Sequence, residues 1–235
     1  MPDGPDGGPT YQFNQMPAEN KIANKFLNYL LKGDSHSARQ LIFSAVEEGF
    51  PVKRIYLEVF QWSQREIGHL WETNQINVAD EHFSTAATQT IMAQLYPYIT
   101  TTSQKHKKAI ITCVPGELHE IGARMVADFL TMGGWDAYYL GANTPTESLI
   151  QKIQSTDPDL VCISVTMTHH VPQLMDLIAQ IRSRLNNPKM KLMVGGRPFL
   201  VSPNLCFSFQ NVDSCLDDVT SVVDFANKLV MKEDS

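Results

Sequence analysis

The sequence lacks the features that mark several protein classes. No apolar run approaches the roughly 18 residues that span a lipid bilayer, and residues 1–14 are polar, without the apolar core of a signal peptide. Basic residues are outnumbered, which gives a formal net charge of −6, whereas direct nucleic-acid binding requires a basic face. We therefore expect a cytoplasmic protein that neither spans a membrane nor binds nucleic acid directly.

Cysteine is scarce. The chain has four cysteines, and no two of them form a Cys-x-x-Cys pair. Cys113, Cys162 and Cys215 lie in or beside apolar runs typical of strands. Because disulfides are rare in cytoplasmic proteins and zinc sites favour closely spaced pairs, we expect all four, Cys206 included, to be free thiols.

The first hundred residues carry the 3.6-residue period of helices. Residues 1–17 precede this pattern and are expected to be disordered. The pattern then predicts four helices: one ending at Gly33, one from Ser35 to Gly49, one from Pro51 through Trp71, and one from Val78 to Tyr96, stopped at Pro97. Short turns between them predict an antiparallel four-helix bundle over residues 18–100.

After a linker at 101–107, strands and helices alternate through residues 108–235. The predicted strands are 108–113, 136–140, 159–165, 190–194 and 213–216. The predicted helices are 119–132, 145–154, 170–184, about 200–208 and 217–231. Five such units predict an α/β fold, a doubly wound parallel sheet of flavodoxin-like strand order.

Three features fall at the carboxyl ends of successive predicted strands. The segment Glu117–Gly122, which contains His119, follows the first strand. Ser164–Thr166 ends the third strand, and Gly195–Gly196 ends the fourth. In this topology all three are expected to face one ligand. The glycine pair removes side chains where something must pass close to the backbone.

Together these residues resemble the cobalamin-binding domain family, which includes methionine synthase, corrinoid methyltransferase proteins and corrinoid mutases. The family pattern is Asp-x-His-x-x-Gly, then Ser-x-Leu, then Gly-Gly. The gap from Gly122 to Ser164 and the gap from Thr166 to Gly195 both match the family's spacing. The resemblance covers about residues 20–232.

The resemblance implies a cobalamin cofactor, either adenosylcobalamin or methylcobalamin. Its dimethylbenzimidazole arm would thread past Ser164 and the pair Gly195 and Gly196. His119 would bind cobalt from below, since a neutral imidazole suits a borderline transition metal. Glu117 could accept the other ring N–H and fix the tautomer.

Three residues depart from the family pattern. Glu117 replaces the usual Asp, and Thr166 replaces Leu. His170, preceded by His169, stands where methionine synthase has a serine. A second imidazole would compete for the carboxylate and shift, weaken or make pH-sensitive the contact between His119 and cobalt. Alternatively, His169 and His170 merely begin a helix.

The helical half contains Trp71 followed, after residues 72–80, by Glu81-His82. Spacing alone favours a core tryptophan and a surface Glu-His pair. The set nevertheless resembles the upper-face signature of light-sensing cobalamin proteins, in which the bundle caps the adenosyl group. His69 could reach the same face. Where full photoreceptors have a cobalt-binding histidine, this chain has Glu72.

The resemblance leads us to expect a cobalamin-dependent light sensor without its own DNA-binding domain. It would signal through bundle rearrangement to a protein partner, either a transcription regulator or a second copy of itself. We find no catalytic residue set. Two alternatives stay open: a corrinoid protein that shuttles methyl groups for a methyltransferase, and a photoreceptor of the same fold that binds another tetrapyrrole. That tetrapyrrole could be, for example, a bilin, with Cys113 or a pocket histidine as a candidate contact.

Overall fold

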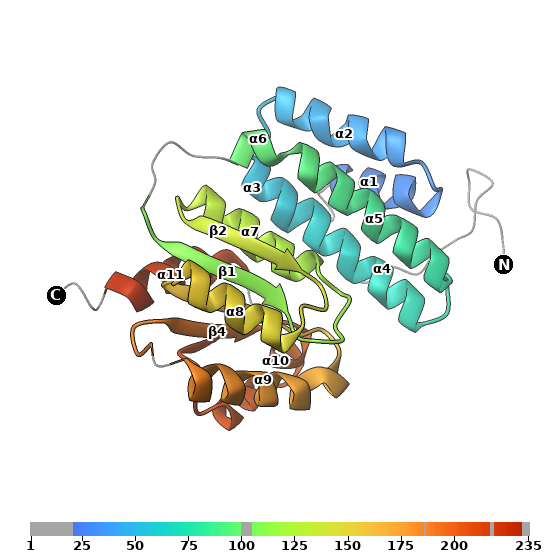
Figure 1. Ribbon diagram of the computed structural model, residues 1–235. Helices are drawn as coiled ribbons and strands as arrows, with labels where there is room; N and C mark the ends of the chain where they lie inside the picture. Colours follow the sequence, from blue (N-terminus) through green and yellow to red (C-terminus); the bar gives the residue numbers. More distant parts are fainter. Residues whose placement is uncertain (1–20, 100–104, 186, 217–218, 232–235) are drawn as a thin grey trace. The chain divides into compact units, whose positions relative to one another are not determined.

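The computed structural model describes residues 21–99, 105–185, 187–216 and 219–231. The chain divides into two compact units, Met1–Tyr98 and Ile99–Ser235, and each is described by itself (Figure 1). The expected disordered tail at 1–17 and residues 101–104 of the expected linker lie outside the described residues.

The N-terminal unit is helical. Its elements are α1 (Lys21–Leu31), α2 (Ser35–Glu47), α3 (Val52–Arg54), the π-helix η1 (Ile55–Gln61), α4 (Trp62–Glu72), α5 (Val78–Gln94) and α6 (Tyr96–Ile99). Apolar side chains from α1, η1 and α4 form its core, among them Phe26, Leu30, Phe60 and Ile67. Side-chain caps begin α2, at Asp34, and α5, at Asn77. The Asn77 side chain accepts from the Asp80 N–H, and the Asn77 N–H donates to the Asp80 carboxylate.

Two details of the helical unit differ from the sequence expectation. The third predicted helix runs continuously from Val52 to Glu72, but Ile55–Gln61 is wound as a π-helix, a rare winding that hydrophobic periodicity does not reveal. The fourth ends at Gln94, before the expected stop, and Pro97 lies inside α6. A proline is tolerated there because the first turn of a helix has no use for its missing N–H.

The C-terminal unit is built on a five-stranded parallel sheet. Its strands are β1 (Lys108–Cys113), β2 (Asp136–Gly141), β3 (Leu160–Ser164), β4 (Lys191–Gly195) and β5 (Ser214–Leu216). They lie in the order β2-β1-β3-β4-β5, which confirms the predicted doubly wound fold. Cys113 pairs with Ser164, and Ser164 with Gly195. The loops that follow β1, β3 and β4 therefore leave the sheet at one edge.

Helices cover both faces of this sheet (Figure 1). They are α7 (Ile121–Met132), α8 (Thr146–Thr156), α9 (Val171–Arg184), α10 (Arg197–Val201) and α11 (Val222–Met231), with the 3-10 turns η2 (Thr168–His170), η3 (Pro203–Ser208) and η4 (Val219–Ser221). Successive strand residues point to opposite faces. Ile110, Val161 and Val194 therefore join one core cluster with side chains of α8 and α9. No helix in the described ranges is long and apolar enough to cross a membrane.

Helix boundaries in this unit also differ from the prediction. The helix expected at about 200–208 is split into α10 and η3, because Pro203 cannot donate the N–H that would continue α10. The helix expected from residue 119 begins at Ile121, and the one expected from 217 begins at Val222 after η4.

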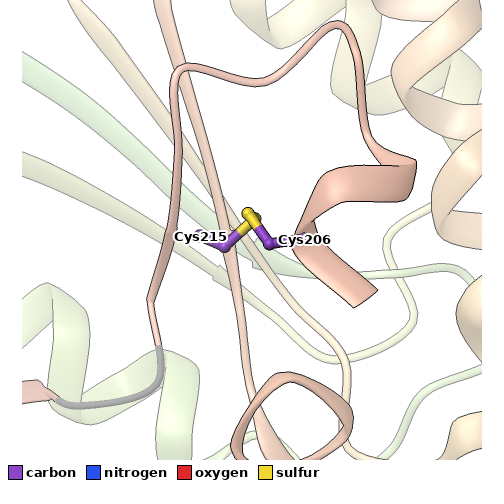
Figure 2. The surroundings of a disulfide bond; sticks show 2 residues. All are labelled: Cys206 and Cys215. Atoms are coloured by element: carbon purple, nitrogen blue, oxygen red, sulfur yellow. A yellow bond between two sulfur atoms is a disulfide. The ribbon is translucent and has the colours of Figure 1, made fainter. Parts of the chain in front are cut away.

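The expectation of four free cysteines is wrong for two of them. Cys206 on η3 and Cys215 on β5 form a disulfide, with their Cα atoms 5.9 Å apart (Figure 2). The chain turns back between η3 and β5, which brings together two residues that are nine positions apart. Cys113 and Cys162 are buried free thiols, as predicted.

The disulfide closes a loop of about ten residues, so its reduction should lower the free energy of unfolding by about 2–3 kcal/mol, through restored loop entropy. Urea unfolding of the chain with and without a dithiol reductant measures this difference. The double variant Cys206→Ser, Cys215→Ser should have the urea midpoint of the reduced protein, and the reductant should not change it. Equal midpoints for the oxidised and reduced wild-type chain would contradict the expectation.

Candidate functional site

The loop between β1 and α7 is shaped by a tight reversal of the chain. The Val114 N–H donates to the Ser164 carbonyl (3.0 Å), and the Glu117 N–H then donates back to the Val114 carbonyl (3.0 Å). Gly116 lies in this turn at φ = 86°, a left-handed conformation that costs glycine nothing. The turn places Glu117 and His119 beyond the carboxyl end of β1.

The carboxylate of Glu117 is the centre of the site. Its side chain is fully buried, with 0% exposure. One oxygen accepts from the His119 backbone N–H at 3.1 Å and contacts the His119 ring nitrogen Nδ1 at 2.5 Å. The other accepts from the backbone N–H groups of Thr166 and Met167, each at 2.9 Å, and contacts the His170 Nδ1 at 3.1 Å. The carboxylate therefore joins the loop after β1 to the loop after β3.

These contacts keep Glu117 ionised. Burial alone would raise the pKa of the carboxyl group. The side-chain hydrogen bond from His119, with the backbone N–H groups of Met167, His119 and Thr166, acts in the opposite direction and prevails. The pKa of Glu117 is consequently held well below its ordinary range, and the group is a carboxylate at neutral pH.

His119 has the environment of an oriented imidazole ligand. Its side chain is 44% exposed, although its carboxylate partner is buried. An ionised carboxylate accepts only, so Nδ1 carries the proton that it donates to Glu117, and in the neutral ring Nε2 carries the lone pair. This is the tautomer that coordinates a transition metal through Nε2. The contact expected from the sequence between Glu117 and His119 is present.

His170 belongs to the same cluster. It ends η2 and is the N-cap residue of α9, close to the helix start that one interpretation of the sequence expected, and its mostly buried ring contacts Glu117, as the other interpretation expected. The two imidazoles use different oxygens of Glu117, so both are held at once. His169 is exposed and packs against His170, with ring centroids 4.1 Å apart. Thr166 contributes its backbone N–H to Glu117.

The glycines and Ser164 lie at the same edge of the sheet. A Cβ atom at Gly122 would lie 3.9 Å from the Ser164 hydroxyl, so the start of α7 approaches the end of β3 closely. Gly196 adopts φ = 119°, and a Cβ there would lie 1.9 Å from the Val165 carbonyl oxygen. The sequence predicted that some group passes close to the backbone of the glycine pair. At Gly196 that group is the Val165 carbonyl.

Cys113 does not have the properties of a reactive thiol. Its side chain is fully buried. Burial, and after it the nearby carboxylates of Glu117 and Glu120, raise the pKa of Cys113 to about 12. A thiol protonated at neutral pH is a poor nucleophile, which argues against covalent attachment of a bilin at this position.

Sequence reasoning missed the contribution of the segment after β2. Asn143, in this segment, accepts from the Gly116 N–H. Glu120 accepts from the Ala142 N–H of the segment and from the Tyr139 hydroxyl, the latter at 3.0 Å. Burial, followed by the Glu120 carboxylate, raises the pKa of Tyr139, so its hydroxyl remains a donor. The available signal was the turn-forming run from Gly141 to Pro145 at the carboxyl end of a strand.

The remaining predicted residues lie in the helical unit. Trp71, near the end of α4, is 37% exposed and is therefore not the core tryptophan that spacing alone favoured. Glu81 contacts the exposed His82 ring at 2.6 Å and accepts from the Thr85 hydroxyl at 2.9 Å. His69 lies on α4, two residues before Trp71. The predicted site residues thus fall into two groups: one gathers around Glu117 in the C-terminal unit, and the other lies in the helical unit.

Comparisons with known proteins decide the class of cofactor. Residues 107–221 match a family described as "B12 binding domain", and residues 22–96 match a second family of the same description. This chain is a corrinoid (B12) binding protein with an N-terminal helical cap domain. In donor chemistry the site fits such a group, because one oriented imidazole accompanies a close approach of the β1, β3 and β4 loops.

Several relatives of this B12-binding protein are named as methylamine corrinoid proteins. "Dimethylamine corrinoid protein 3" from Methanosarcina acetivorans is 24% identical over 68% of this chain and 77% of its own length. "Trimethylamine corrinoid protein 1" from the same organism is 22% identical over 78% of this chain and 86% of its own length. The solved monomethylamine corrinoid protein of Methanosarcina barkeri shares the fold, with a TM-score of 0.79 and 20% identity over 90% of this chain and all of that one. These matches do not support the expected kinship with light sensors and favour the methyl-carrier alternative.

Replacing Glu117 by glutamine should destabilise the B12-binding protein at neutral pH and flatten its acid dependence. The folded pKa of Glu117 lies below the ordinary value of 4.5, so the unfolded state takes up the proton first as the pH falls. The carboxylate's contribution is therefore full above about pH 5 and declines as the pH drops further. We expect Glu117→Gln to be less stable by about 2 kcal/mol at pH 7, with a smaller difference at pH 3.5.

Urea unfolding of both chains at the two pH values measures this difference. Comparing variant with wild type cancels the contributions of the other carboxylates. A gap that stays constant or widens toward pH 3.5 would contradict a depressed pKa.

Proposed function

We propose that this corrinoid protein carries a methyl group between protein partners, with His119 as the lower axial ligand of cobalt. The observation that carries the proposal is the buried Glu117 carboxylate, which holds the Nδ1 of a half-exposed imidazole at 2.5 Å. A bound corrinoid supplies a cobalt that is already ligated by its ring and can accept and release a methyl group. The chain then needs to supply only one ligand from below.

The donor set supports a single-imidazole site. Among the described residues, no group of three or more His, Cys, Asp or Glu side chains could hold a bare metal ion. Because Glu117 binds Nδ1, the ring presents Nε2 to a metal. The ionised carboxylate also raises the basicity of the imidazole and so strengthens its bond to the metal.

Ser164, Thr166 and the glycines would receive the nucleotide arm of the corrinoid. Gly122 approaches the Ser164 hydroxyl without a side chain between them. The pairing of Ser164 with Gly195 places Ser164 beside the glycine pair at the sheet edge. The small side chains in this region support a role in admitting the arm.

Methyl transfer is supported by the relatives that are named for methylamines. A carrier of this kind works with a methyltransferase, which we propose as the protein partner. The fold similarity to the monomethylamine corrinoid protein extends over 90% of the chain and so includes the helical cap domain.

Replacing His119 by alanine should remove the nitrogen ligand from cobalt. We expect the visible absorption of the corrinoid-loaded protein to shift to that of corrinoid without a nitrogen ligand, and retention of corrinoid on gel filtration to fall at least tenfold. The control is His106→Asn, at the amino end of the sheet, where asparagine tolerates the positive φ of 56°. An unchanged spectrum in His119→Ala would refute the ligand assignment.

The same preparation tests the cofactor. Cobalt at one equivalent per chain supports the corrinoid. A pigment that absorbs in the red, without cobalt, would instead support the bilin alternative.

A second candidate function is light sensing, with adenosylcobalamin as the cofactor. The observation that favours it is Trp71, a large apolar side chain left partly exposed, in the same unit as a Glu81 side chain that is fixed by His82 and Thr85. A rigid aromatic wall and an oriented carboxylate suit the apolar and polar parts of an adenosyl group. The partner of such a sensor would be a transcription regulator or a second copy of the chain.

One comparison separates the two functions. If the cap domain receives adenosyl, Trp71→Ala should weaken binding of adenosylcobalamin by tenfold or more and leave that of methylcobalamin nearly unchanged. Green light should then change the spectrum and the elution volume of the adenosylcobalamin-loaded wild-type chain. Equal effects of Trp71→Ala on both cofactors, with no change of elution volume in light, would exclude sensing and leave the methyl carrier.

A further inference from the structure

A four-residue segment that runs from the last residue of β2 toward α8, Gly141–Thr144, is bonded to the loop that carries His119. We call this segment the brace. The Gly116 N–H donates to the side-chain oxygen of Asn143 at 2.8 Å, and the Asn143 N–H donates to the Glu117 carbonyl at 3.0 Å. A single brace residue thus binds both members of the dipeptide that precedes Leu118 and His119.

Asn143 is suited to this position by its backbone. Its φ of 50° is left-handed, and asparagine tolerates that conformation better than most residues with a side chain. The conformation allows its own N–H and its side-chain oxygen to serve the same neighbouring loop. An alanine would lose the acceptor and would also tolerate the left-handed backbone poorly. A glycine would lose only the acceptor.

The brace also contacts the loop on the other side of His119. The Ala142 N–H donates to the Glu120 carboxylate at 2.8 Å, and Tyr139 donates to the same oxygen at 3.0 Å. The Thr112 hydroxyl donates to the Thr144 hydroxyl at 2.9 Å, which ties the brace to the end of β1. The segment that carries the imidazole is consequently held before and after His119.

We propose that Asn143 is a positioning residue for the corrinoid site and fixes the loop that presents His119 to cobalt. Glu117 sets the rotation of the imidazole, because it binds Nδ1 directly. The backbone of the loop is set by separate bonds, and the pair made by Asn143 is the one that brackets Gly116 and Glu117. Losing the Asn143 acceptor frees the left-handed Gly116 turn and lets the imidazole withdraw from the position of coordination. This inference rests on the proposed corrinoid function.

The test uses three variants of the full chain. Asn143→Gly keeps the left-handed backbone and its N–H but removes the side-chain oxygen. Asn143→Asp keeps an acceptor in the same place. Glu147→Gln, in the first turn of the adjacent α8, removes an ion pair with Arg184 that touches no residue of the His119 loop, and serves as the matched control.

Two measurements are made on each variant. The first is hydrogen exchange of the Gly116 amide in the corrinoid-free protein. The second is the ratio of nitrogen-free to nitrogen-coordinated corrinoid in the loaded protein, read from visible absorption. In Asn143→Gly both should rise about fivefold, the factor that corresponds to one hydrogen bond of average net strength. Asn143→Asp and Glu147→Gln should match the wild type in both.

Each outcome bears on a different claim. Faster exchange in Asn143→Gly with a wild-type spectrum would reduce Asn143 to a structural role and overturn the inference, as would unchanged exchange. Failure of Asn143→Asp to restore the wild-type ratio would also overturn it. A wild-type chain that binds no corrinoid would overturn the proposed function itself, whereas nitrogen-coordinated corrinoid in the wild type and in Asn143→Gly alike would overturn only the role of Asn143.

Discussion

The structure of the site depends on one buried negative charge. The Glu117 carboxylate has no exposed surface, and its two oxygens share donors from the loops after β1 and β3. A buried ion that lost its partners would cost several kcal/mol, so the two loops cannot separate without a large penalty. The contact that orients His119 is thus also the contact that holds the carboxyl edge of the sheet together.

This arrangement separates two tasks between two parts of the chain. The sheet unit supplies an oriented imidazole and close-packed loops, which any corrinoid would use whatever group lies on its upper side. In the proposed light sensor, Trp71 and Glu81 of the helical cap domain would select the upper group. The similarity to methylamine corrinoid proteins and the exposed Trp71 therefore bear on different parts of the proposal. A methyl carrier and an adenosyl-dependent sensor can share the same lower face.

Much of the fold could be predicted from the sequence, because alternating strand and helix patterns determine a doubly wound sheet almost by themselves. The contact between Glu117 and His119 could also be predicted, since both residues lie in one short loop. Contacts between loops were harder. His170 is 53 residues from Glu117, and their contact follows from the register of β1 against β3. The Asn143 bonds depend likewise on a left-handed backbone that only the structure reveals.

The local exceptions have physical reasons of the same kind. The π-helix Ile55–Gln61 keeps its buried side chains apolar, as an α-helix would, so the composition of the segment carries no sign of the altered winding. The disulfide between Cys206 and Cys215 depends on the path of the chain from η3 into β5, while the absence of paired motifs and the expected compartment both argued for free thiols.

The geometry at Gly196 limits what a glycine pair says about cofactor binding. A side chain there would collide with the Val165 carbonyl even in a chain that never meets a cofactor. The fold itself therefore requires a glycine at this position, whether or not a cofactor binds. A glycine pair alone does not identify a B12 site, and the dyad of buried acid and half-exposed imidazole is the more specific feature.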